Sequence, residues 1–160
     1  MKKILVLFLL LCQISFSQTK EETIEWLNLN LENYGDNQIM GTYQIEAKID
    51  PDYGEYLLFT KKSWNSFLEK STYDYYTLKP DAISSIYLSG KGRTNKTLDI
   101  YVKSETNRIY NSGKEKFFGE FDICMKNGYN EMAERLQIGL LYLFEVMGNK
   151  IENPKDLFKN

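Results

Sequence analysis

Residues 43–50 read YQIEAKID, and apolar and polar side chains alternate along the whole stretch. A period of two predicts a β-strand that buries one face and leaves the other in water. Residues 50–54 follow as DPDYG, and Asp, Pro and Gly are typical of tight turns. Residues 55–62 then predict a returning strand. The chain therefore starts its sheet with an antiparallel hairpin.

The same patterns continue through the middle of the chain. Strands are predicted at residues 70–78, 83–89, 95–103, 108–110 and 117–125, which makes about seven in all. Short connections favour antiparallel pairing of neighbours. Residues 89–96, SGKGRTNK, join two of these strands. They lack the spacing of a phosphate-binding loop and the helix that should follow it, so they predict a hairpin loop.

An amphipathic helix is predicted before the strands. Thr19 and Glu22 have the spacing of a capping box, and apolar residues then recur at helical spacing. Gly35 follows the last of them, where it can adopt a left-handed C-cap. The predicted helix spans residues 20–34.

A second helix is predicted after the strands. An apolar stripe runs from residue 132 to residue 147, and Gly148 ends it. Gly139 within this helix indicates a close approach to the sheet. The element order predicts an α+β fold with antiparallel strands, an N-terminal helix, and a C-terminal helix that covers the sheet or plugs one end of a barrel.

The N-terminus has the order of a secretory signal peptide. Lys2 and Lys3 precede an apolar run that is shorter than the ~20 residues of a membrane-spanning helix. Small residues then precede Gln18, which predicts cleavage between Ser17 and Gln18. We therefore expect a signal peptide at residues 1–17 and a single domain at residues 18–160, located in the periplasm or outside the cell.

An alternative form of export depends on Cys12. This cysteine follows a leucine run, as the lipidated cysteine of a bacterial lipoprotein does, although the preceding Leu11 is larger than the residue usually found there. The alternative to a free exported protein is thus a lipoprotein anchored at Cys12. In either form we expect no transmembrane helix in the mature chain.

The composition argues against several classes of function. The chain has no histidine, which is the commonest metal ligand, the usual general base and a member of most serine and cysteine triads. Cys124 is the one cysteine after residue 17, so we expect it to be a buried, inert thiol. Removing Lys2 and Lys3 from 20 basic residues leaves 18 against 22 acidic ones, a net charge of −4 that argues against nucleic-acid binding. We predict no metal and no other cofactor.

Residues 79–86, KPDAISSI, lead from one predicted strand into the next and resemble the mid-domain strand entry of pleckstrin-homology-like folds. Together with the strand count and the closing helix, the resemblance covers residues 39–147. It implies a bent antiparallel barrel of about seven strands that is closed by the C-terminal helix. The whole chain is also similar to small exported proteins of Bacteroidota-type bacteria, which implies that this chain is exported as well.

Two groups of charged side chains are candidates for a site. Glu120 and Asp122 alternate on a predicted strand and so share a face, where a carboxylate pair can act as acid and base. The alternative is a solvated strand face. Lys91, Arg93 and Lys96 form the densest basic cluster, which would suit an anionic ligand or a lipid headgroup, or is simply a soluble loop tip.

Tyr73 and Tyr75 lie close together on another predicted strand. Tyrosines can stack on sugars or line a groove, and packing across the sheet is the alternative. We predict a non-enzymatic binding or interaction module whose site is a sheet edge or the cavity beneath the closing helix, with an envelope protein or a small ligand as its partner. An enzyme that uses Glu120 and Asp122, and a lipid-anchored surface subunit, are the two alternatives.

Overall fold

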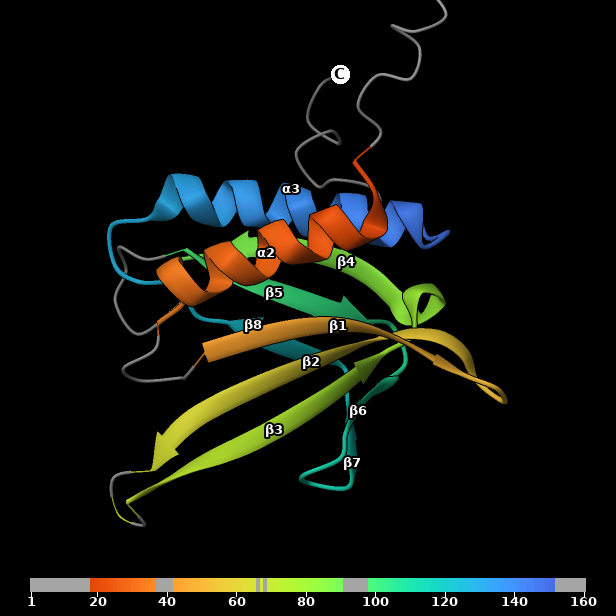
Figure 1. Cartoon of the computed structure of the whole chain (residues 1–160), viewed down its shortest axis with the longest axis horizontal. Coiled ribbons are helices and arrows are strands. Elements are labelled where there is room, and N and C mark those ends of the chain that lie inside the picture. The colour runs from red at the N-terminus through yellow and green to blue at the C-terminus, as the bar shows by residue number, and fades with distance from the viewer. Residues whose placement is uncertain (1–17, 37–41, 66, 68, 91–97, 152–160) are drawn as a thin grey trace, which may run out of the picture.

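The computed structural model describes residues 18–36, 42–65, 67, 69–90 and 98–151. Within them the chain forms two α-helices and eight strands, so the predicted α+β class is confirmed (Figure 1). In chain order the elements are α2 (Lys20–Tyr34), β1 (Thr42–Asp50), β2 (Gly54–Asn65), β3 (Lys70–Leu78), the short 3-10 helix η1 (Pro80–Ala82), β4 (Ile83–Ser89), β5 (Asp99–Ser104), β6 (Ile109–Asn111), β7 (Lys116–Phe118), β8 (Glu120–Ile123) and α3 (Asn130–Val146).

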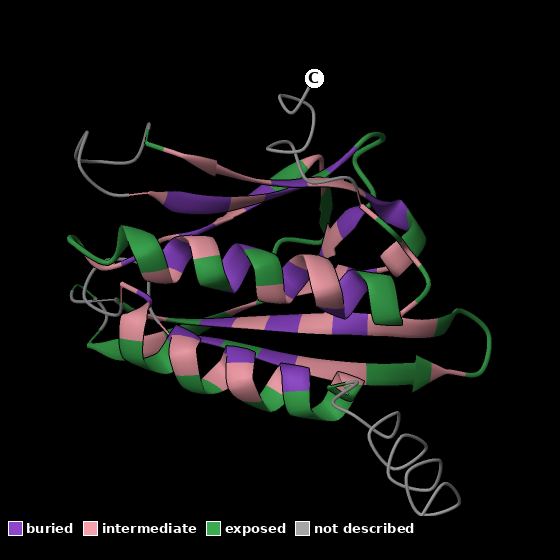
Figure 2. Ribbon diagram, turned by 90° about the horizontal axis from the view of Figure 1, so that it is seen from above, coloured by how far each residue is buried: buried purple, intermediate pink, exposed green. Residues whose placement is uncertain are grey.

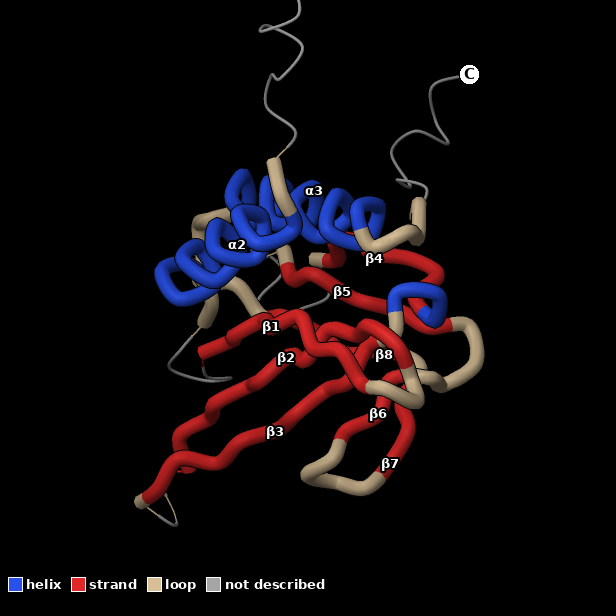
Figure 3. Tube along the Cα trace, turned by 45° about the vertical axis from the view of Figure 1, so that its right-hand side comes forward, coloured by secondary structure: helices blue, strands red, loops and turns tan. Residues whose placement is uncertain are grey.

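The strands form two antiparallel sheets, one of five strands in the order β1-β2-β3-β6-β7 and one of three in the order β4-β5-β8. No ladder between described residues joins the two sheets, so they do not close. The predicted pleckstrin-homology-like barrel of about seven strands is therefore not confirmed. The physical reason lies at β1, because α2 runs along its free edge, where a closed barrel would need another strand (Figure 3).

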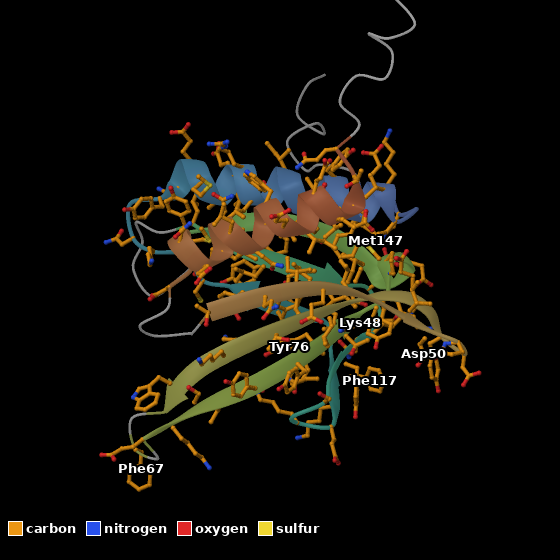
Figure 4. The ribbon with its side chains drawn as sticks, viewed as in Figure 1. Lys48, Asp50, Phe67, Tyr76, Phe117 and Met147 are labelled. Atoms are coloured by element: carbon orange, nitrogen blue, oxygen red, sulfur yellow. The ribbon has the colours of Figure 1, made fainter. Side chains whose placement is uncertain are left out.

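The predicted strand over residues 117–125 is wrong in one respect, because it breaks at Gly119. β7 pairs with β6 in the large sheet, whereas β8 pairs with β5 in the small one. A Cβ at Gly119 would lie 2.5 Å from Oδ1 of Asn107, so a larger residue would displace the Asn107 side chain where the chain passes between the sheets. Phe117 consequently leaves the core and is 64% exposed on β7 (Figure 4).

Local signals set the start of α2. The Thr19 hydroxyl accepts a hydrogen bond from the Glu22 backbone N–H at 3.1 Å, and the Thr19 N–H donates to the Glu22 carboxylate at 2.8 Å. The predicted capping box is confirmed. The left-handed cap at Gly35 is wrong, because its φ is −65°. Glycine is required there because a Cβ would lie 2.5 Å from the Leu31 carbonyl oxygen.

The two helices lie side by side and cover one side of the strands (Figure 1). Buried positions recur along both of them (Figure 2). One core unites helices and sheets, and its fully buried members include Leu27, Leu31, Ile45, Phe59, Ile100, Ile123, Leu140 and Phe144. The close approach at Gly139 is to α2 and not to the sheet, because a Cβ there would lie 2.9 Å from the Trp26 ring.

Candidate functional site

The two predicted catalytic carboxylates, Glu120 and Asp122, lie on β8 of the three-stranded sheet. Each already has a partner, because the Tyr87 hydroxyl donates to Glu120 and the Cys124 thiol donates to Asp122 at 3.1 Å. Neither carboxylate lines any of the three cavities at α2 and its neighbours. The structure thus shows the pair as part of a hydrogen-bonded strand face.

Cys124 is half-buried, whereas the sequence predicts a buried residue. Burial, together with the hydrogen bond to Asp122, raises the pKa of the Cys124 thiol to about 12. The same two causes, burial and a hydrogen bond to Glu120, raise the pKa of Tyr87 to about 12. Both groups are therefore protonated at neutral pH, and the Cys124 thiol is a poor nucleophile there.

The remaining predicted residues fall into two groups. Cys12, Ser17, Lys91, Arg93 and Lys96 lie outside the described residues. Gln18 is exposed, and its carbonyl accepts a hydrogen bond from the Tyr142 hydroxyl at 2.7 Å. Tyr73 and Tyr75 are exposed on the outer face of β3, with stacked rings whose centroids are 6.3 Å apart.

A polar contact that the sequence does not reveal lies at the edge of the large sheet. The Ile45 N–H on β1 donates to Oδ1 of Asn28 at 2.7 Å, and Nδ2 of Asn28 donates to the Ile45 carbonyl at 2.9 Å. These are the two hydrogen bonds that a residue on a neighbouring strand would make. Asn28 of α2 therefore takes the place of a strand at this one position.

The contact at Ile45 also shows in which direction the backbone N–H and C=O groups of the following β1 residues point. Backbone polar groups alternate between the two sides of an antiparallel strand, so residues two apart point the same way. Ala47 and Ile49 thus direct their N–H and C=O groups to the free edge. Between described residues, the structure gives these groups no hydrogen bond on that side. They are open to water or to an added strand.

A groove of about 640 Å³ runs beside this open edge, between β1 and the first half of α2. Ile24, Ala47 and Ile49 form its apolar part, and Ile49 is 80% exposed although its neighbours on the same face, Tyr43 and Ile45, are buried. The strand passes the start of α2 between Lys48 and Asp50 (Figure 4). The apolar side of β1 is therefore left uncovered where the helix begins.

The groove has a negative lining. Four carboxylates line it, those of Glu21, Glu25, Glu46 and Glu55, against the ammonium group of Lys20 in the lining and that of Lys48, which pairs with Glu46. Lys20 donates to Glu55, and this hydrogen bond raises the pKa of Lys20. The excess of carboxylates favours a ligand that carries positive charge.

No family model, curated protein or solved structure matches this chain. Over the ranges that the structure covers, no group of three acidic, cysteine or histidine side chains could hold a metal ion. In the same residues no helix is long and apolar enough to cross a membrane.

The open edge of β1 and its groove are the candidate functional site.

Sequence reasoning named a sheet edge as one possible site but did not identify the strand. Ala47 and Ile49 belong to the stretch whose alternation predicts a half-buried strand, and alternation does not say whether a strand is central or at an edge. Asn28 carries no local signal, because an asparagine on the polar side of a helix is common. Its role depends on a contact with Ile45, 17 residues away.

Proposed function

We propose that this protein is an exported, non-enzymatic interaction module that binds an extended segment of a partner protein along the free edge of β1. The observation that carries the proposal is the pair of hydrogen bonds between Asn28 and Ile45. They give the edge a strand-like neighbour at Ile45 and leave the next two edge positions, Ala47 and Ile49, open. Addition of a peptide strand to an exposed edge is a common mode of recognition.

The backbone supplies the binding energy in this mode. Two N–H and two C=O groups of Ala47 and Ile49 are available, and each hydrogen bond contributes roughly 0.5–1.5 kcal/mol net. Apolar side chains of the added strand would cover Ile49 and Ile24, which supplies a further gain from burial.

The charges in the groove define the chemistry of the partner. Glu21 and Glu25 lie on the α2 side of the groove, so a Lys or Arg side chain of the added segment would face a carboxylate. The partner segment is therefore one in which apolar residues alternate with basic ones.

A second copy of the same chain fits this edge poorly. Antiparallel pairing that engages Ala47 and Ile49 of both copies would place Lys48 opposite Lys48, and like charges in that position are destabilising. A register centred on Ala47 would need the edge groups of Ile45, which Asn28 already binds. Lysine on an edge strand is a usual guard against self-pairing, so the partner is a different chain.

A synthetic peptide of alternating Val and Lys, blocked at both ends, tests the proposal with the full chain expressed from its complete coding sequence. Binding should slow amide hydrogen exchange at Ala47 and Ile49, as measured by NMR. The same peptide with Glu in place of Lys is the charge control and should bind more weakly.

Ala47→Pro separates strand addition from simple charge attraction. It removes the N–H from the open edge and leaves the charge of the groove unchanged, so peptide binding should fall about tenfold, which corresponds to about 1.4 kcal/mol. Equal binding by the wild-type protein and Ala47→Pro, or exchange that slows elsewhere and not at the edge, would exclude this site.

Export has its own test. The intact mass of the protein recovered from its host distinguishes a chain that begins at Gln18 from one that begins at a diacylated Cys12. A mass that includes residues 1–17 would contradict both forms of export.

A further inference from the structure

A second cavity, of about 370 Å³, lies on the other side of Asn28 from the groove. It reaches from the second half of α2, at Glu32, over the edge of β1 to the outer face of the large sheet at Tyr73. Its volume is at the lower end of the range for small-ligand sites. Peptide binding at Ala47 and Ile49 would leave it open.

One wall of this cavity is an aromatic ring. Tyr73 is 47% exposed, and the Tyr75 ring lies beside it with 12° between the ring planes. The two side chains are i and i+2 on β3, so they share the outer face of the sheet. The exposed part of the Tyr73 ring offers a ligand a surface on which to stack.

Most of the remaining lining consists of dispersed polar groups of different kinds. Thr42 and Thr60 bring hydroxyls, Gln44 an amide, Lys62 an ammonium group and Glu32 a carboxylate. No Val, Leu, Ile, Met or Phe side chain is part of the lining, as far as the described residues extend. The set offers donors and acceptors on several sides and no large net charge.

We infer that this cavity binds a neutral sugar ring of an oligosaccharide. A pyranose has an apolar face of C–H groups that can lie on Tyr73, and hydroxyls around its rim that can both donate and accept hydrogen bonds. A phosphate or carboxylate would gain from Lys62 but would meet Glu32. A wholly apolar ligand would displace water from the hydroxyls of Thr42 and Thr60 and give no hydrogen bond in return, which is costly.

The site differs from the peptide groove in the residues that carry it. Tyr73, Thr60 and Lys62 line the sugar cavity and are absent from the groove, whereas Ala47 and Ile49 line the groove and are absent from the cavity. Substitutions of Tyr73 and Ala47 thus test the two proposals separately. If one of the two proposals fails its test, the other is not affected.

The probes are cellobiose, maltose and N,N′-diacetylchitobiose, titrated into the full-length protein and followed by calorimetry and by saturation-transfer NMR. We expect saturable binding of at least one of them. Tyr73→Ala should weaken it about tenfold, or about 1.4 kcal/mol. Tyr73→Phe keeps the ring and should retain most of the affinity.

Tyr53→Ala is the matched control, because Tyr53 is 68% exposed and lies at the β1–β2 turn, outside the cavity. Its affinity for the sugar should equal that of the wild-type protein. The inference is overturned if none of the three sugars binds saturably, if Tyr73→Ala and Tyr53→Ala bind alike, or if phenol binds the cavity more tightly than every sugar.

Discussion

Two proline substitutions at adjacent positions of β1 test the direction of its backbone groups. Ala47→Pro removes an N–H that points to the free edge, whereas Lys48→Pro removes one that points to β2. The assignment follows from the Ile45 N–H, which donates to Asn28, and from the register that places Lys48 opposite Tyr56. Proline is tolerated in a sheet only where its missing N–H would have faced solvent.

The expected costs differ severalfold. Lys48→Pro loses a ladder hydrogen bond of about 1 kcal/mol, leaves the facing carbonyl of Tyr56 unpaired at about 1–3 kcal/mol, and brings the ring against β2. We expect a loss of ~2–4 kcal/mol in the free energy of unfolding. Ala47→Pro breaks no ladder bond, and the stiffer unfolded chain offsets local strain, so its change should stay within about 1 kcal/mol.

Urea denaturation followed by circular dichroism measures the free energy of unfolding of both variants, provided the slope of that free energy against urea concentration is the same for each. A Lys48→Pro protein as stable as the Ala47→Pro protein, or the reverse order of stabilities, would refute the assignment. Ala47 and Ile49 would then not present their backbone groups at the free edge, and the proposed pairing of a partner strand with these two residues would fail.

Other predictions concern the core and the small sheet. Leu140→Ala should cost about 2–5 kcal/mol in urea denaturation because Leu140 is fully buried, whereas Ile138→Ala, at a 59% exposed position on the same helix, should be nearly neutral. The pKa of Cys124 rises from 9.0 to about 12, so its contribution to stability is complete below pH 9.0 and disappears as the pH rises toward 12. Denaturation measured across that window should show the decline, and Cys124→Ser should reduce it. Glu120→Gln should bring the pKa of Tyr87 back toward 10.0, as followed by ultraviolet titration of the phenol; an unchanged value would mean that the hydrogen bond does not form in solution.

The sequence predicts the elements whose ends are marked by nearby residues. The capping box at Thr19 places α2, and the turn at 50–54 places the β1–β2 hairpin. The break at Gly119 was missed because β7 and β8 read as one alternating run. β7 pairs with β6 and β8 pairs with β5, and a Cβ at Gly119 between them would lie against the side chain of Asn107, 12 positions away. A contact between residues 107 and 119 cannot be recognised from the local alternation of apolar and polar residues.

The candidate site also combines features that the local sequence predicts with features that depend on distant contacts. Alternation along 43–50 predicts which side chains of β1 face the core but not which of its edges is paired. That depends on whether another strand reaches β1, and the deciding residue, Asn28, lies on a helix. The exposure of Tyr73 and Tyr75 likewise depends on the outer face of β3 being left uncovered by the helices. Propensity alone favours packing for such residues as readily as binding.

The end of α2 is tied to the chain just after β8. Backbone hydrogen bonds join Tyr34 to Lys126 and Asp36 to Cys124, and the Lys126 ammonium donates to the Asn33 carbonyl, 93 residues away. These bonds cannot form until the ribosome has released most of the polypeptide. The C-terminal end of α2 therefore completes its contacts only after β8 has been made, although the helix can already pack on β1 through Asn28, and the protein completes its fold late.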